Sequence, residues 1–215
     1  MDFFSIKNTF FTIAGNGVSY LEFFSVLLGL TTVFLAGRGK IHNYWVGYAY
    51  SILLFFLFFQ KSLYSSMILQ PISLAIAVFG HYRWSHPKQG EANKKNELKV
   101  TILNNKSRII YLLIIAAFAL LWGLFLKNIN LIFTDINPAN RPFLDAMITA
   151  TLLIAQYLSA QKKLDCWGAW LIVNASNITL YILAGLAFMP MVSGAYLIMA
   201  FLGFAAWRKQ HLESK

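Results

Sequence analysis

The sequence predicts an all-α integral membrane protein with seven transmembrane helices. Hydrophobic residues make up 58% of its 215 residues and charged residues only 12%, whereas roughly a quarter of an ordinary soluble domain is charged. So few charges cannot cover the surface of a compact soluble fold. Charged residues also separate long apolar windows, and one membrane helix needs about 20 apolar residues. These observations exclude a typical soluble enzyme, a disordered chain and a disulfide-rich secreted domain.

The first part of the chain predicts three spans. Residues 1–17 precede them and are expected to lie along the membrane interface, because apolar side chains recur there at helical spacing, namely Phe3, Ile6, Phe10 and Ile13. Residues 18–82 hold three apolar windows, separated by basic residues that include Lys40 and Lys61. Residues 83–107 are polar and basic, and we expect them to form a solvated cytoplasmic linker near anionic lipid headgroups.

Four further spans are predicted in the second part. Residues 108–127, the most apolar stretch, predict a single connecting helix. Residues 142–207 predict three more helices, and two of these lie in the uncharged stretch from Cys166 to Trp207. A turn between those two is expected just before Pro190, because Gly and Pro interrupt helices. Residues 208–215 form a polar tail.

The basic residues predict the orientation. An odd number of spans places the two termini on opposite sides of the membrane. Of the 18 Lys and Arg residues, 14 fall on the side of the linker and the tail, and four on the other side. Because basic residues concentrate in cytoplasmic loops, we expect an outside N-terminus and a cytoplasmic C-terminus. The asymmetry also explains the net charge of +10 without nucleic acid as a partner, since the linker lacks the motifs of nucleic-acid readers.

The two groups of three predicted spans share a weak internal repeat. A shift of 123 residues lays the first group over the second without a gap and aligns scarce residues that mark the same helix ends. The aligned pairs are Glu22 with Asp145, Lys40 with Lys163, Tyr44 with Trp167, Gly80 with Gly203, and Trp84 with Trp207. A single connecting helix makes the repeats parallel, giving a 3+1+3 arrangement. Small transporters use parallel repeats and bind substrate near the mid-membrane between them.

The sequence carries no signature of an enzyme, a cofactor or a metal site. It lacks the zinc motif His-Glu-x-x-His, the Gly-x-Ser-x-Gly elbow and the P-loop, and its four histidines are widely spaced. No predicted span has Lys, Arg, Asp or Glu at its middle, where ion-coupled carriers usually place one. This pattern favours an uncoupled facilitator. Outside transport, the alternative is a structural membrane subunit.

Polar side chains inside the predicted spans are the candidate substrate-binding residues. They are Gln70 near the middle of the third span and, on one face of the sixth span, Trp170, Asn174, Asn177 and Tyr181. A carboxamide in hydrocarbon needs a partner, which is either a neighbouring helix or a ligand. Rings flanked by carboxamides suit a flat aromatic ligand with an amide or hydroxyls, and a cationic ligand gains further from the rings.

Two acidic residues, Glu22 and Asp145, stand at the outer edges of predicted spans. Each is either a carboxylate favoured by the dipole of a helix N-terminus or part of an outer vestibule or gate. A vestibule lined by carboxylates would attract a cation.

Five short stretches resemble the Pnu family of vitamin transporters, in particular its nicotinamide riboside transporters. The stretches are Met1–Asn8, Ser62–Gln70, Gly80–Trp84, Arg141–Asp145 and Trp170–Asn174. Their order and spacing extend the resemblance over nearly the whole chain outside the linker. The resemblance implies a three-one-three helix fold similar to the SWEET-type sugar facilitators, a homotrimer, and a place in the bacterial inner membrane.

The resemblance also implies a function. This is facilitated diffusion of nicotinamide riboside, with cytoplasmic phosphorylation trapping the product for NAD biosynthesis. The family site lies between the repeats, and the matching residues here are Gln70, Trp170, Asn174, Asn177 and Tyr181. The second span departs from the family, because Tyr50 or Ser51 aligns with an Asn of many relatives. Thiamine, riboflavin and sugars are the alternative substrates. A mononucleotide is disfavoured, since no mid-membrane base is present to hold its phosphate.

Overall fold

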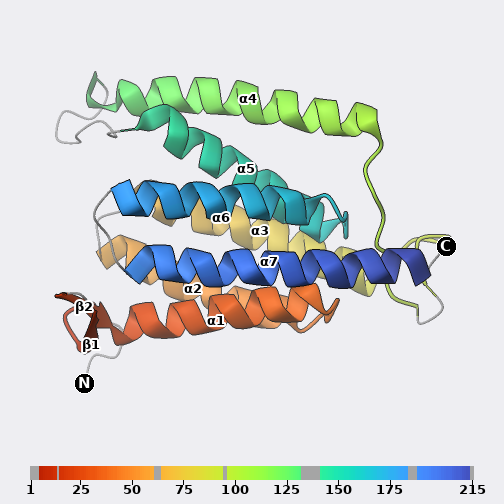
Figure 1. Cartoon of the computed structure of the whole chain (residues 1–215), viewed down its shortest axis with the longest axis horizontal. Coiled ribbons are helices and arrows are strands. Elements are labelled where there is room, and N and C mark those ends of the chain that lie inside the picture. The colour runs from red at the N-terminus through yellow and green to blue at the C-terminus, as the bar shows by residue number, and fades with distance from the viewer. Residues whose placement is uncertain are drawn as a thin grey trace.

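The structure is a computed structural model that describes residues 5–13, 15–60, 64–93, 96–131, 141–183 and 188–213. Within these ranges seven α-helices run side by side, roughly along the long axis of the molecule (Figure 1). They are α1 (Tyr20–Gly37), α2 (Asn43–Gln60), α3 (Tyr64–Ser85), α4 (Asn105–Lys127), α5 (Pro142–Ala160), α6 (Cys166–Leu183) and α7 (Phe188–Glu213). All of them except α2 and α3 are long and apolar enough to cross a membrane. The all-α prediction is confirmed, apart from a short N-terminal hairpin.

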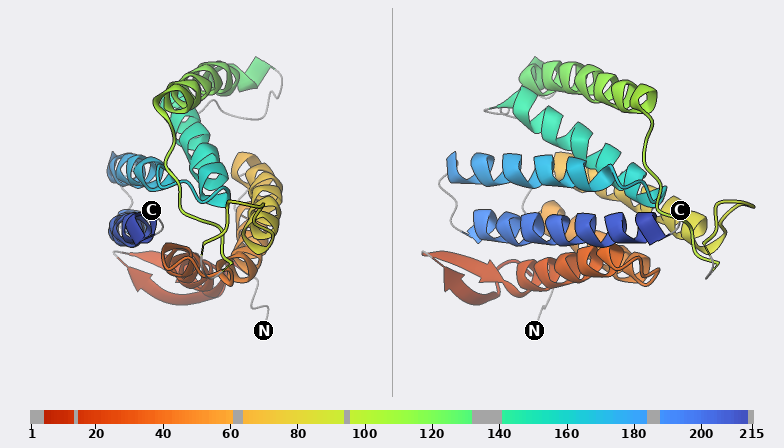
Figure 2. Two further views of the ribbon diagram at one scale, coloured as in Figure 1. Left: turned by 90° about the vertical axis from the view of Figure 1, so that its right-hand side faces the viewer. Right: turned by 45° about the vertical axis from the view of Figure 1, so that its right-hand side comes forward.

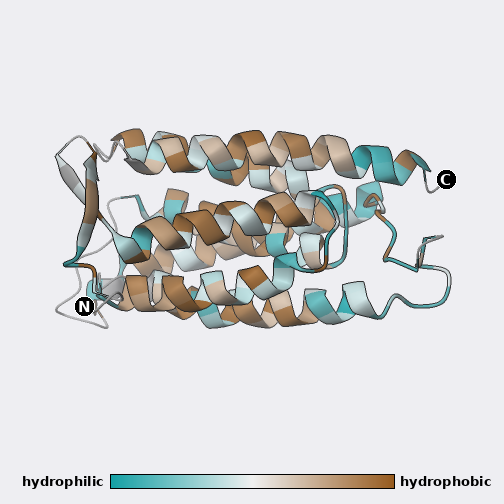
Figure 3. Ribbon diagram, turned by 90° about the horizontal axis from the view of Figure 1, so that it is seen from below, coloured by the Kyte–Doolittle hydropathy of each residue, from teal (hydrophilic) through white to brown (hydrophobic). Residues whose placement is uncertain are grey.

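Six of these helices form a closed ring. α1 packs against α2 and α7, α2 against α3, α3 against α5, α5 against α6, and α6 against α7. α4 packs on α5 outside the ring (Figure 2, left), and the short 3₁₀ helix η1 (Ile129–Leu131) follows it. α4 exposes large apolar side chains, among them Leu112, Leu113 and Leu121. Hydrophobic residues dominate the middle of the helices, and hydrophilic ones gather toward the end that carries the C-terminus (Figure 3). This distribution fits a helix bundle in lipid.

The N-terminal segment is a β-hairpin and not the helix suggested by the spacing of Phe10 and Ile13, while its place along the membrane interface stays a prediction. Strands β1 (Thr9–Ile13) and β2 (Asn16–Ser19) pair antiparallel. Between them Gly15 has a φ of +81°, a conformation that favours glycine. β1 consists of β-branched and aromatic residues, which favour strands over helices. Phe10 packs its ring on Tyr20 and Phe23 of α1, and thereby holds the hairpin to the helix bundle.

Equivalent hydrogen bonds recur at the 123-residue spacing. The Trp207 indole N–H donates to the carbonyl of Ala36 at 3.0 Å. The Trp84 indole N–H donates to the carbonyl of Ser159 at 3.3 Å. Both the donors and the acceptors of these two bonds are 123 residues apart in the sequence. The bonds tie α7 to α1 and α3 to α5, which are the two contacts that join the halves of the ring.

The aromatic packing beneath these bonds follows the same spacing. Tyr44 meets Trp84 edge-to-face with ring centroids 5.2 Å apart, and Trp167 meets Trp207 edge-to-face at 5.3 Å. Both pairs have interplanar angles of 86°. These four rings are buried and belong to one hydrophobic core, which sits at the C-terminal end of the ring, meaning the end that carries the C-terminus. The residues that the repeat aligned therefore form the core at this end.

The turns that end α1 and α5 are also alike. The backbone N–H of Lys40 donates to Leu35, and that of Lys163 donates to Leu158, each at 2.9 Å. In each turn the preceding residue has a positive φ, +70° at Gly39 and +55° at Lys162. A glycine adopts this conformation freely, whereas a lysine rarely does.

The linker between α3 and α4 is partly buried, and our expectation of a solvated linker is wrong for this part. Leu98 and Val100 are only 4% and 3% exposed and belong to the core at the C-terminal end. Thr101 pairs with the α5–α6 turn, because its N–H donates to Lys162 and its carbonyl accepts from Leu164. The ring of His211 lies 2.8 Å from the carbonyl of Val100. The linker therefore crosses the C-terminal end of the ring (Figure 2, left).

The connection between α6 and α7 (residues 184–187) lies outside the described residues. Pro190 falls in the first turn of α7, where a missing N–H removes no helical hydrogen bond.

Candidate functional site

Two carboxamides lie within the helices of the ring. The Gln70 amide on α3 donates to the carbonyl of Ser66 at 3.1 Å, and the Asn174 amide on α6 donates to that of Trp170 at 2.8 Å. Each bond stays within its own helix and uses one of two N–H groups, so each amide keeps a donor and its oxygen acceptor for a ligand. α3 and α6 are not neighbours in the ring. The two amides therefore come from separate sides of it.

The predicted residues of α6 occupy one helical face. Trp170 and Asn174 are one turn apart, and the Asn174 side-chain amide donates a hydrogen bond to the Trp170 carbonyl. Asn177 and Tyr181 continue the same face. Asn174 is buried, while the other three are half-buried. Trp170 packs against the core at the C-terminal end. The face thus runs from that core toward the opposite end of α6.

Two tyrosines that sequence reasoning did not select lie deep in the ring. Tyr50 of α2 and Tyr196 of α7 both pack against Gly29 of α1. A Cβ atom at position 29 would lie 3.0 Å from the Tyr50 ring and would collide with the Tyr196 hydroxyl, so glycine makes room for both. The Tyr196 hydroxyl is buried and lies beside the Tyr50 hydroxyl, close enough for the two to interact. A signal was present in the sequence, since interfacial belts do not explain tyrosines this far inside spans.

Tyr181 connects this tyrosine pair to Asp145, the acidic residue in the first turn of α5. Its hydroxyl lies close enough to the Asp145 carboxylate, and to Tyr50, for the groups to interact electrostatically. Asp145 is half-buried in the first turn of α5. The series Asp145, Tyr181, Tyr50 and Tyr196 therefore draws polar groups from α5, α6, α2 and α7.

Glu22 has a local structural role. It forms a capping box with Ser19: its carboxylate accepts from the Ser19 N–H at 2.9 Å, and its own N–H donates to the Ser19 hydroxyl at 3.2 Å. These bonds satisfy N–H groups at the start of α1. A part for Glu22 in an outer vestibule stays a prediction.

A third polar residue that the sequence analysis did not select is Gln156 of α5. Its side-chain oxygen is buried and has no hydrogen-bond partner among the described residues. Such an acceptor is costly to leave without a partner. The signal in the sequence was an amide inside an apolar span, the same signal that selected Gln70.

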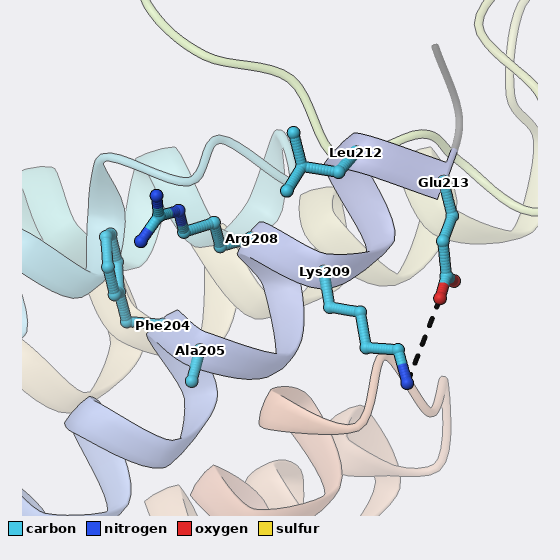
Figure 4. Close-up of a pocket in the computed structure, with 6 residues that line it drawn as sticks. All are labelled: Phe204, Ala205, Arg208, Lys209, Leu212 and Glu213. Atoms are coloured by element: carbon cyan, nitrogen blue, oxygen red, sulfur yellow. Dashed lines mark ion pairs between the residues drawn. The ribbon is translucent and has the colours of Figure 1, made fainter.

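Two pockets outlined by described residues lie at the C-terminal end, away from these polar groups. One is a shallow hollow along the end of α7 (Figure 4), and Lys209 and Glu213 pair across one turn there at 3.9 Å. It is built from a single helix and is open to its surroundings. The other lies between the linker and the turns of the ring. In the described part of the chain, His, Cys, Asp and Glu form no group of three that would hold a metal ion.

A model of the nicotinamide mononucleotide transporter family matches residues 19–209, which include all seven helices of the structure apart from the last residues of α7. The chain belongs to this family. It is a membrane transporter close to PnuC, which confirms the resemblance to the Pnu family drawn from the short motifs.

Curated relatives agree with this assignment. The chain is 27% identical to the nicotinamide riboside transporter PnuC of Escherichia coli (strain K12), over 94% of this chain and 91% of the relative. It is 25% identical to the riboflavin/roseoflavin transporter RibM of Streptomyces davaonensis, over 84% of this chain and 81% of that protein. The crystal structure of the vitamin B3 transporter PnuC has the same fold, with a TM-score of 0.68 at 20% identity, covering 91% of this chain and 83% of that one.

Proposed function

We propose that the chain carries nicotinamide riboside across the bacterial inner membrane. Most support comes from the character of the polar groups inside the ring. They are neutral amides and phenols, with Asp145 toward the outer end. In the described helices, Lys and Arg occur only near helix ends. A pyridinium cation with a carboxamide and a ribose suits such groups, whereas a phosphate would lack a basic partner.

The proposed site contains the residues selected from the sequence and the tyrosine pair. Trp170 and the tyrosines offer faces for the pyridinium ring, and each stacked ring adds roughly 0.5–2 kcal/mol for a cation. Gln70, Asn174 and Asn177 offer amides for the carboxamide and the ribose hydroxyls. Tyr181 and Asp145 form the outer approach, with Glu22 as a further acidic residue at that end. The paired hydroxyls of Tyr50 and Tyr196 are candidate ligand partners that the sequence did not suggest.

We further infer that residues 18–82 and 142–207 form parallel repeats joined by α4, in the 3+1+3 manner of SWEET-type facilitators. The recurring hydrogen bonds and ring pairs at the 123-residue spacing support this arrangement. The ring order supports it too, because exchanging α1–α3 with α5–α7 leaves every contact of the ring in place. Transport would then proceed as one repeat rocks against the other.

The distribution of basic residues supports a cytoplasmic C-terminus. Of the described basic residues, Lys7, Lys127 and Arg141 lie at the end of the hairpin, and all others lie in the linker, the turns and the helix ends near the C-terminus. Basic residues of this kind mark the cytoplasmic side. The homotrimer implied by the family resemblance stays a prediction.

Binding of the four vitamin ligands by the purified protein tests the substrate. We expect saturable calorimetric binding of nicotinamide riboside, with only weak competition for that site by its mononucleotide, thiamine and riboflavin. Asn174→Ala and Gln70→Ala should each weaken riboside binding about tenfold, because each removes a hydrogen bond to the ligand. Gln89→Ala, which removes an exposed linker amide, is the matched control and should bind as the parent does. Preferential binding of riboflavin would assign the substrate of RibM instead. If no ligand bound to folded protein, a sugar carrier or a structural subunit would be favoured.

Transport into sealed vesicles tests the mechanism. Without a kinase inside, we expect the riboside to equilibrate and not to accumulate, because the middle of the described helices holds no charged residue to couple an ion. Adding a riboside kinase and ATP inside should then produce accumulation through phosphorylation. Accumulation driven by a proton or sodium gradient without the kinase would contradict uniport.

A further inference from the structure

The second pocket lies at the C-terminal end, separate from the proposed riboside site. Its volume is about 270 Å³, slightly below the roughly 300–1,000 Å³ typical of pockets for drug-sized ligands. Four segments line it: the α1–α2 turn, the end of α3, the linker, and the α5–α6 turn. The lining residues are Gly39, Lys40, Ile41, His42, Trp84, Asn96, Glu97, Leu98 and Lys162.

Lys162 is an unusual residue in this pocket. Its backbone has a positive φ of +55°, which is strained for any residue with a side chain. It is only 2% exposed, and its ammonium has no carboxylate of the described residues within 4.0 Å. The ammonium instead lies 4.8 Å above the Trp84 ring. Burial lowers the pKa of the Lys162 amine, and the more distant Glu97 carboxylate raises it only in part.

The equivalent turn shows that a lysine is not needed for the fold. Gly39 occupies the same place in the α1–α2 turn, with the same kind of backbone and no side chain. The Lys162 nitrogen lies 3.6 Å from where a Cβ atom of Gly39 would stand, so Lys162 reaches across from one turn to the other. A glycine at position 162 would make the turn without strain and without a buried charge. The turn itself therefore requires neither the strain nor the buried charge of Lys162.

The surroundings of Lys162 favour an anion. The pocket borders the N-terminus of α2, which begins at Asn43, and helix N-termini attract negative charge. Lys40 and His42 stand exposed at this edge, and Glu97 is the acidic residue of the lining. A small doubly charged anion would satisfy the buried ammonium more fully than the ring of Trp84 does.

We propose that this pocket binds the phosphate group of a phosphate monoester, and that the bound phosphate holds the C-terminal end of the ring closed. The second part rests on the proposed function, since phosphorylation after uptake would produce such a monoester on this side. The pocket is walled by a turn from each half of the ring and by the linker, so an occupant bridges all three. A ligand that binds only the closed form stabilises it in proportion to its concentration. Phosphorylated product would thus slow further uptake.

Phosphate binding by the purified full-length protein tests this proposal. Nicotinamide mononucleotide and inorganic phosphate are titrated in the presence of saturating nicotinamide riboside, which keeps the proposed transport site occupied. We expect saturable binding of the mononucleotide, reduced at least tenfold by Lys162→Gln. Lys209→Gln, which removes an exposed lysine of α7, is the control and should bind as the parent does. Riboside binding should be the same in all three proteins.

Two further titrations, with inorganic phosphate and with phosphatidylglycerol, separate the possible sources of the phosphate. Equal affinity for inorganic phosphate would show that the monoester's organic part is not recognised, and would overturn the product-binding proposal. Loss of mononucleotide binding on adding phosphatidylglycerol to the micelles would assign the pocket to a lipid headgroup. This result would also overturn the product-binding proposal. If Lys162→Gln does not fold, Lys40→Gln at the exposed edge should still weaken binding several-fold.

Two results would overturn the proposal directly. One is the absence of saturable mononucleotide binding to folded parent protein, and the other is binding that the Lys162 and Lys40 variants leave unchanged. A transport measurement distinguishes failure of this proposal from failure of the proposed function. Mononucleotide placed inside riboside-transporting vesicles should slow uptake in the parent and not in Lys162→Gln, whereas absence of any riboside uptake would refute the proposed function alone.

Discussion

The Gly203→Ala protein is expected to unfold at a much lower temperature than the parent. A Cβ atom at position 203 would lie 2.5–2.6 Å from carbons of the Trp167 ring. Trp167 is only 2% exposed and is held edge-to-face against Trp207, so it has no free space to move into. Overpacking a tight core costs about 1–3 kcal/mol and sometimes more, and we expect about 3 kcal/mol here. Thermal unfolding of the detergent-purified protein measures the effect.

The same helix offers a matched control. At Gly194 of α7 a Cβ atom would meet nothing within 4 Å. Gly194→Ala should therefore leave stability unchanged or raise it, since alanine favours helix over glycine by up to about 1 kcal/mol. Gly80→Ala, at the equivalent position of α3, should resemble Gly203→Ala, because its Cβ atom would lie 2.5 Å from the Tyr44 hydroxyl oxygen and 2.9 Å from the Ala160 Cβ. Equal melting temperatures of the Gly203→Ala and Gly194→Ala proteins would show that the close contact between Gly203 and Trp167 is not present.

The repeat in the sequence anticipated much of this core. The alignment that paired Gly80 with Gly203, and Trp84 with Trp207, rested on scarce residues at helix ends. The structure gives each pair equivalent contacts. Scarce residues were informative because Gly marks close helix approach and Trp fills the space that Gly leaves. Apolar residues such as Leu carried no such information, since in lipid either face of a helix accepts them.

The sequence marked both tyrosines as unusual, but it could not predict that Tyr50 and Tyr196 meet, and the reason is geometric. Tyr50 and Tyr196 lie on helices far apart in the chain, and they meet only because α1 carries Gly29 between them. A tyrosine inside a span faces either the lipid or the interior of the ring, and its sequence position does not decide which. That choice depends on the order of helices in the ring, which the alignment did not supply.

Glu22 illustrates a local signal that was readable and passed over. Ser19-Tyr-Leu-Glu22 is the pattern of a capping box, directly before an apolar run. The pattern predicts that the carboxylate bonds the backbone at the start of the helix, as the structure has it. Asp145 lacks such a box, because Arg141 precedes its helix without a side-chain cap. Of the two outer acids, Asp145 is therefore the better candidate for attracting a cation.

The buried part of the linker was hidden by its basic surroundings. Leu98 and Val100 alternate with Lys99 and Thr101, which is the pattern of a strand with one face buried. The run is too short to distinguish from chance among so many charged residues. What fixes it is tertiary structure, because Thr101 pairs with the α5–α6 turn and Asp165 accepts from the Leu103 N–H at 2.8 Å.

Val100→Asp is expected to release the linker from the C-terminal end while leaving the helices folded. Val100 is 3% exposed in an apolar core, and a carboxylate without a buried partner costs several kcal/mol there. The helices keep their own contacts, so circular dichroism should show unchanged helix content. Trypsin should cut next to Lys99 and Lys106 at least ten times faster than in the parent. Ile102→Asp is the matched control, because Ile102 is two residues away and 43% exposed, and it should be cut at the parental rate.

The same variant decides whether the linker is a wall of the Lys162 pocket. Asn96, Glu97 and Leu98 belong to the linker, so its release opens one side of the pocket. Mononucleotide binding should then weaken at least as much as in Lys162→Gln, while riboside binding inside the ring is retained. Loss of both ligands together would mean that the linker supports the whole ring, and a parental trypsin rate would mean that burial of Val100 does not hold it. Because the two binding measurements report two separate sites, Val100→Asp separates a local closing element from a general structural one.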